Sequence, residues 1–107
     1  MGEYKVFISE PAEKDIYEIF FYISTQFQTQ VTAEDMIDTI HQAMASLKHM
    51  PKRNPLVKDA FLGNLGYRIQ PVKNYLIFYS VVDSPTLDVN IERILYNRRN
   101  WQYLLNQ

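Results

Sequence analysis

Hydrophobic residues recur at two different spacings along the chain, and the spacing changes near residue 65. Beyond a short strand-like start, they first follow steps of three and four positions, and later they alternate with polar residues or run without interruption. The first spacing is typical of amphipathic helices and the second of β-strands. The pattern therefore predicts helices in the first half of the chain and a sheet in the second.

The first half predicts a short strand and then a helix. Residues 4–8 are rich in aromatic and β-branched side chains, which favour a strand. Ser9 or Glu10 can cap the helix, with Pro11 in its first turn. Asp15 suits the positive N-terminal end of this helix. Its apolar positions are Ile16, Ile19, Phe20, Ile23 and Phe27.

A second helix follows a short polar link at residues 28–30, with Thr32 as its cap and Pro51 as its stop. Its apolar positions are Ala33, Met36, Ile37, Ile40, Ala43, Met44, Leu47 and Met50. Two amphipathic helices joined this closely predict an antiparallel hairpin. The first helix also carries aromatic residues beside its stripe, so it is either deeply buried or meets another chain along one flank. These are Tyr17, Phe21 and Tyr22.

The second half predicts three antiparallel strands. Residues 66–72 and 87–92 alternate between apolar and polar side chains, whereas residues 75–82 are apolar on both faces, as in a covered central strand. Lys73-Asn74 and residues 83–86 have the composition of turns. Successive short turns favour a meander.

These elements predict an α+β fold in a single domain over residues 1–107. The helical hairpin and the sheet both have apolar faces that must be buried, so the hairpin packs on a small antiparallel sheet. We expect the N-terminal strand to join the sheet beside the last strands. A short C-terminal helix follows the sheet, and residues 50–64, which hold two prolines, form a surface loop.

Composition narrows the class of protein. The chain has 107 residues, of which 47% are hydrophobic and 21% charged, as in soluble globular domains. No run is long enough to span a bilayer and no signal-peptide pattern is present, so we expect a cytoplasmic protein without membrane contact. Cysteine is absent, which excludes disulfides and thiolate metal sites and suits a reducing compartment.

The net charge of −1 is unevenly distributed. Residues 1–47 hold two lysines against eight acidic residues, and residues 48–107 hold nine basic against four acidic residues. A basic half can offer a face to an acidic partner. The whole chain lacks the basic excess of a protein that binds nucleic acid by charge alone.

Residues 92–105 concentrate the candidate chemistry. Three arginines lie between Arg93 and Arg99, interleaved with Tyr96 and followed by Trp101. Guanidinium groups beside aromatic rings bind phosphate, carboxylate or a stacked base. A last strand and docking helix with a solvated charged edge would show the same pattern.

Most enzyme chemistries lack their residues in this chain. His41 and His49 stand eight positions apart without a metal-binding motif, and no serine or glycine motif of a hydrolase or phosphate-binding loop is present, so we expect neither metal nor cofactor. Metal-independent RNA cleavage through the 2′-OH stays open, because it needs only a base, an acid and cations. Its candidate residues, each of which solvation or packing also explains, are Arg68, Lys73, Arg93, Tyr96 and Arg98.

Five segments in order carry a family resemblance. They are Ser9 to Ile23 (SEPAEKDIYEIFFYI), Met50 to Pro55 (MPKRNP), Gly66 to Ile69 (GYRI), Asn74 to Tyr79 (NYLIFY) and Ile91 to Trp101 (IERILYNRRNW). Each segment alone is a weak match to the family, but the five together, in this order, cover nearly the whole chain. The sequence resembles the RelE/ParE superfamily of toxins from type II toxin–antitoxin modules, and best its ParE-like branch of plasmid stabilisation proteins.

The resemblance implies a toxin that arrests bacterial growth and is held inactive in a hetero-oligomer with a cognate antitoxin. ParE-like members poison DNA gyrase without catalysis, whereas RelE-like members cleave messenger RNA on the ribosome. The ParE-like tail and the slightly acidic net charge favour gyrase, although histidine commonly stands in that family at the position of Tyr96. A RelE-like endonuclease and a purely structural homologue remain the alternatives.

The residues expected to bind the antitoxin or the target are Arg68, Arg93, Arg98, Arg99 and Trp101. Charge reversal at Arg98 or Arg99 should weaken antitoxin binding, more so at low salt, where charges are least screened. A buried contact should cost roughly 2–5 kcal/mol and a rim contact well under that. Isothermal titration of Arg98→Glu and Arg99→Glu at two salt concentrations measures the loss. Unchanged affinity at both would mean that the basic tail faces away from the antitoxin.

Overall fold

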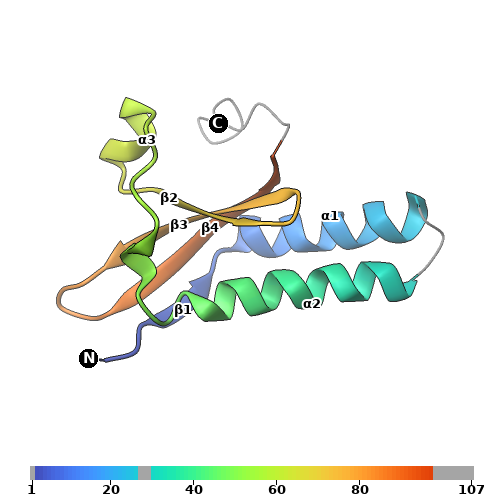
Figure 1. Ribbon diagram of the computed structural model, residues 1–107, viewed down its shortest axis with the longest axis horizontal. Coiled ribbons are helices and arrows are strands. Elements are labelled where there is room, and N and C mark those ends of the chain that lie inside the picture. Colours follow the sequence, from blue (N-terminus) through green and yellow to red (C-terminus); the bar gives the residue numbers. More distant parts are fainter. Residues whose placement is uncertain (1, 27–29, 98–107) are drawn as a thin grey trace.

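Two helices and a four-stranded sheet form the layers of the protein (Figure 1). The computed structural model describes residues 2–26 and 30–97. The elements in chain order are β1 (Lys5–Ile8), α1 (Glu10–Gln26), α2 (Gln30–Ser46), the 3-10 helix η1 (Pro51–Arg53), α3 (Ala60–Asn64), β2 (Arg68–Val72), β3 (Tyr75–Val82) and β4 (Asp88–Tyr96). The expected C-terminal helix lies outside the described residues.

The sheet has the order β1-β4-β3-β2. Strands β2, β3 and β4 pair antiparallel, which confirms the predicted meander, and β1 joins it beside β4. The β1–β4 pair is parallel, so the sheet is antiparallel only over its last three strands. β2 lies at an edge, where Pro71 costs no ladder hydrogen bond to a further strand.

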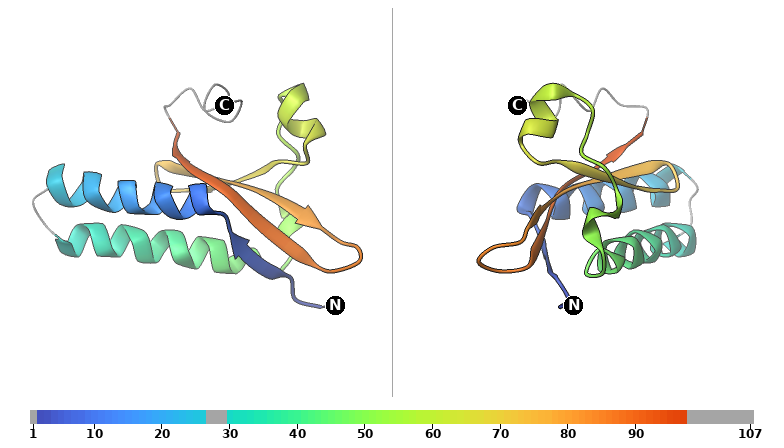
Figure 2. Two further views of the ribbon diagram at one scale, coloured as in Figure 1. Left: turned by 180° about the vertical axis from the view of Figure 1, so that it is seen from behind. Right: turned by 60° about the vertical axis from the view of Figure 1, so that its left-hand side comes forward.

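The helical hairpin covers one face of the sheet, as its apolar stripes predicted (Figure 2). Ala12 and Ala33 are fully buried, and their small side chains let the helices approach their neighbours closely. Burial of each large apolar side chain contributes about 1.5–3 kcal/mol before entropy is counted. The buried core includes Ile19, Ile23, Ile40, Met44, Leu47, Ile77, Tyr79, Val89, Ile91 and Ile94.

α3 lies on the other side of the sheet from the helical hairpin (Figure 1). Together with η1 it replaces part of the surface loop that was predicted over residues 50–64. Phe78 points away from the helical hairpin, because it alternates with Ile77 and Tyr79, which belong to the hairpin core. Leu62 of α3 and Phe78 are both almost completely buried. Burial of Phe78 as well as of Ile77 and Tyr79 agrees with the apolar character of β3 on both faces. Within the described ranges, no helix is long and apolar enough to cross a membrane.

The predicted end of the second helix was also wrong. α2 ends at Ser46 rather than near Met50, which adopts a left-handed conformation with a φ of 48°. Arg53 then donates from Nη1 to the carbonyl oxygens of Ser46 at 3.2 Å and His49 at 3.0 Å, which satisfies acceptors that a helix end leaves open. β4 continues to Tyr96 through an irregularity in its pairing with β3.

Side chains at the start of α1 and just before it bind the edge of β4 where β1 stops. β1 pairs with β4 only as far as Ile91. Beyond that point, the Ser9 hydroxyl donates to the carbonyl of Glu92 at 2.8 Å, and the backbone N–H of Ile94 donates to Asp15 at 2.9 Å. The polar side chains of Ser9, which precedes α1, and of Asp15 on α1 thus satisfy backbone groups that a longer β1 would have bound.

Asp15 also forms a two-pronged ion pair with Arg93. The guanidinium donates from Nε at 2.8 Å and from Nη2 at 3.0 Å to the two carboxylate oxygens. Asp15 is only 7% exposed, so the carboxylate depends on these donors. The hydrogen bonds to Asp15 raise the pKa of Arg93. Asp15 therefore makes a tertiary contact, and the predicted helix-end role does not account for its burial.

Asp15→Asn should destabilise the fold by roughly 3–5 kcal/mol, because the amide lacks the charge and turns a donor toward Arg93. Urea unfolding followed by circular dichroism measures the loss. The matched control is Glu18→Gln, an exposed carboxylate one turn further along α1. Equal stabilities of the two variants would contradict the assignment of Asp15 as an anchor.

Candidate functional site

The structure places Arg68 apart from Arg93 and Tyr96, whereas the turn that holds Lys73 lies beside the end of β4, where the N–H of Asn97 donates to the carbonyl of Asn74 at 2.9 Å. Arg68 begins the edge strand β2, Arg93 lies on β4, and β3 runs between them. Lys73 sits in the β2–β3 turn with a left-handed φ of 54°, exposed to solvent. Tyr96 ends β4 opposite Tyr75. The remaining candidates lie outside the described residues, and these are Arg98, Arg99 and Trp101.

Arg68 belongs to a hydrogen-bonded cluster around a buried tyrosine. Its Nη1 donates to the carbonyl oxygen of Asn54. The Asn54 amide donates at 3.0 Å to the hydroxyl of Tyr79, which in turn donates at 2.6 Å to the carbonyl of Pro51. Tyr79 is fully buried, and burial raises the pKa of its hydroxyl. This cluster fixes the segment after α2 on the sheet and holds Arg68 beside it.

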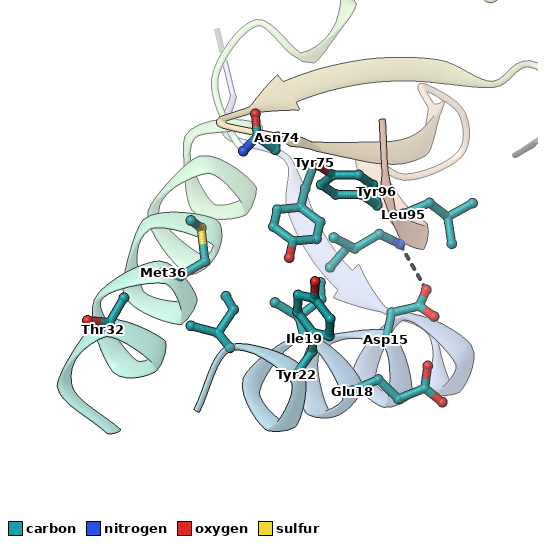
Figure 3. Close-up of a pocket in the computed structure, with 12 residues that line it drawn as sticks. Asp15, Glu18, Ile19, Tyr22, Thr32, Met36, Asn74, Tyr75, Leu95 and Tyr96 are labelled. Atoms are coloured by element: carbon teal, nitrogen blue, oxygen red, sulfur yellow. Dashed lines mark hydrogen bonds between the residues drawn. The ribbon is translucent and has the colours of Figure 1, made fainter. Parts of the chain in front are cut away.

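A groove of about 730 Å³ lies between α1, α2 and the ends of β3 and β4 (Figure 3). Its volume is within the range of pockets that bury a small molecule or a set of side chains. Apolar side chains from both layers form much of its wall, namely Ile19, Ile23, Met36, Ile94 and Leu95. The polar lining residues are Asp15, Glu18, Thr32 and Asn74.

Three tyrosines from three elements meet at this groove: Tyr22 of α1, Tyr75 of β3 and Tyr96 of β4. The rings of Tyr75 and Tyr96 stand edge to face, with centroids 5.6 Å apart. Tyr75 is buried, whereas Tyr22 is 60% and Tyr96 is 36% exposed. Burial, followed by the proximity of Tyr22 and Tyr96, raises the pKa of Tyr75. The groove is thus aromatic at its mouth as well as apolar inside.

The charge at the groove is acidic. Among the described residues, Asp15 and Glu18 line it, and no lysine or arginine does. The basic second half of the chain did not predict this, because both carboxylates come from α1. One signal was available: Asp15 falls on the same helical stripe as Ala12, Ile19 and Ile23, and a buried acid needs a partner. Nothing in the sequence pattern pointed to Tyr22 and Tyr75 as a pair.

The fold, a helical hairpin on a small sheet with a side-chain-lined groove at one end, agrees with the family comparison. The family described as the ParE toxin of the type II toxin–antitoxin system parDE matches residues 6–101. The chain therefore belongs to this family, within the RelE/ParE superfamily. As a member of this family, it is the toxin component of a type II toxin–antitoxin system. No curated protein sequence matches it.

Two solved structures share the fold at low sequence identity. The chromosomal ParDE toxin–antitoxin system from P. aeruginosa aligns with a TM-score of 0.71 and 12% identity, over 88% of this chain and 96% of the other. The toxin–antitoxin complex RelBE2 from Mycobacterium tuberculosis aligns with a TM-score of 0.63 and 17% identity, over 88% and 98%. Identities this low establish the fold alone.

Tyr79→Phe should destabilise the protein by about 1–3 kcal/mol, because it leaves the Pro51 carbonyl and the Asn54 amide without the hydroxyl. The expected result is a lower urea midpoint with an unchanged slope. Tyr17→Phe is the matched control, since Tyr17 is 68% exposed and should change stability very little. A Tyr79→Phe midpoint equal to that of Tyr17→Phe would show that the cluster contributes nothing.

Proposed function

We propose that this protein arrests bacterial growth by inhibiting DNA gyrase and that a cognate antitoxin holds it inactive. The observation that carries the proposal is the match of the ParE toxin family over residues 6–101. Family members of this branch poison gyrase, as the resemblance of the sequence implied. Gyrase as the target places the protein in the bacterial cytoplasm.

The arrangement of the predicted catalytic residues supports a binding inhibitor over a nuclease. Cleavage through the 2′-OH needs cations, a base and an acid around one phosphate. Arg68 pairs with Tyr79 and Tyr96 with Tyr75, so they lie four residues apart along β3 and on strands either side of it. Four residues span roughly 13 Å of strand. Arg68 and Arg93 also donate to acceptors within the protein.

We further propose that the antitoxin binds at the groove. Both structural neighbours are described as toxin–antitoxin systems or complexes. The groove offers apolar walls. The apolar face of an amphipathic segment can pack against such walls. Such a segment loses conformational entropy on binding, so it needs buried anchors.

Induction of the chain should stop growth, and co-expression of the product of an adjacent small gene should restore it. Purified protein should block supercoiling by gyrase or trap cleaved DNA, while toeprints on translated messenger stay unchanged. These two assays separate the candidate mechanisms directly.

New cuts in messenger that disappear in Arg68→Ala, without any effect on gyrase, would establish the ribosome-dependent endonuclease instead. Normal growth with soluble, folded protein in the cell would overturn both mechanisms. The urea-unfolding curve of the purified protein is the control for folding in every arm.

A further inference from the structure

The groove brings aromatic ring faces and an unbalanced negative charge to one place. Edge-to-face packing of Tyr75 on Tyr96 leaves at least one face of each ring free of the other. Figure 3 shows Tyr22 and Tyr75 pointing toward one another from α1 and the sheet. Aromatic faces carry negative electrostatic potential and attract cations within about 6 Å of the ring centre.

Near these rings, the Arg93 guanidinium is the one cationic group that interacts with both the Asp15 and the Glu18 carboxylate among the described residues. Arg93 is hydrogen-bonded to Asp15, and its pKa is raised first by those bonds and further by the charge of Glu18. The cluster of Asp15, Glu18 and Arg93 therefore keeps one excess negative charge. Glu18 is exposed and has no hydrogen-bond or salt-bridge partner among the described residues.

The exposed rings and the excess negative charge determine which kind of side chain can bind in the groove. An acidic side chain would meet Glu18 as a like charge, and a purely apolar one would cover Glu18 without compensating its lost hydration. A lysine or arginine side chain can lay its methylene stem along the apolar wall and bring its charge to the rings and to Glu18.

We propose that the antitoxin segment in the groove carries a basic residue, held at the groove mouth against the ring of Tyr22 and close to Glu18. Apolar anchors of the same segment fill the wall formed by Ile19, Ile23 and Met36. The identity of the partner rests on the proposed function, whereas the preference of the groove for a cation does not. The basic second half of the chain would have suggested an acidic partner at this surface.

The test uses the full chain, made by cell-free synthesis and isotope-labelled for nuclear magnetic resonance. The probe is N-acetyl-leucyl-lysine methylamide, compared with its norleucine and glutamate counterparts. The lysine probe should bind about fivefold or more tightly than the norleucine probe, and the glutamate probe weakest. Amide shifts should centre on Tyr22, Tyr75 and Tyr96, and the preference for lysine should shrink as salt is added.

Two pairs of variants locate the effect. Glu18→Gln should lose the preference for lysine, whereas Glu34→Gln, which removes an exposed carboxylate of α2 outside the groove lining, should keep it. Tyr22→Phe retains an aromatic face and should keep most of the preference, but Tyr22→Leu should lose it despite its apolar side chain. Because both α1 positions are exposed, the spectrum of each variant can confirm that it folds.

Several outcomes overturn the proposal. Equal binding of norleucine and lysine would mean an apolar groove, and preference for glutamate would mean an acidic partner. The same amides shifting with protein concentration alone would mean that a second copy of the chain fills the groove. No shift with any probe at millimolar concentration would remove the site. Failure of growth arrest would overturn the toxin proposal and leave these titrations unaffected.

Discussion

The buried carboxylate of Asp15 sets how α1 lies on the sheet. It binds the Arg93 guanidinium through both oxygens and accepts the backbone N–H of Ile94, so one side chain holds the helix to a strand and closes that strand's open edge. These three hydrogen bonds fix the rotation of α1 about its axis. Glu18 and Tyr22 follow at helical spacing on the same side, and both therefore line the groove.

A second anchor lies further along β3, at Tyr79, and has a different chemical basis. The Tyr79 hydroxyl is buried and neutral, and its hydrogen bonds hold the segment after α2. The cationic side chains of Arg53 and Arg68 lie near the Tyr79 hydroxyl, whereas the carboxylates of Asp15 and Glu18 line the groove. The unequal distribution of charge along the sequence is thus also a distribution in space. The acidic side chains of α1 lie at the groove, and basic side chains lie around Tyr79.

Under the proposed function, the toxin meets an antitoxin and a cellular target, and this distribution of charge bears on both. An antitoxin and a cellular target need not use the same surface, and surfaces of opposite charge can distinguish them through their electrostatic fields. The ion pair between Asp15 and Arg93 removes one of the predicted binding arginines from easy contact with either partner. The proposed antitoxin segment, with its apolar side chains and its cation, would use the groove instead.

The sequence by itself determined the helices, the three-stranded meander and the family, because periodicity and turn residues act over a few positions and the resemblance spans the chain. It did not reveal α3, whose five residues are too short to show a helical period between two prolines and a glycine. Nor did it reveal the groove. Asp15 and Arg93 are 78 positions apart, and Tyr22, Tyr75 and Tyr96 come from three separate elements. Only packing of the hairpin on the sheet decides which charges cancel and which remain, because electrostatic and aromatic contacts depend on distance in space and not on spacing along the chain.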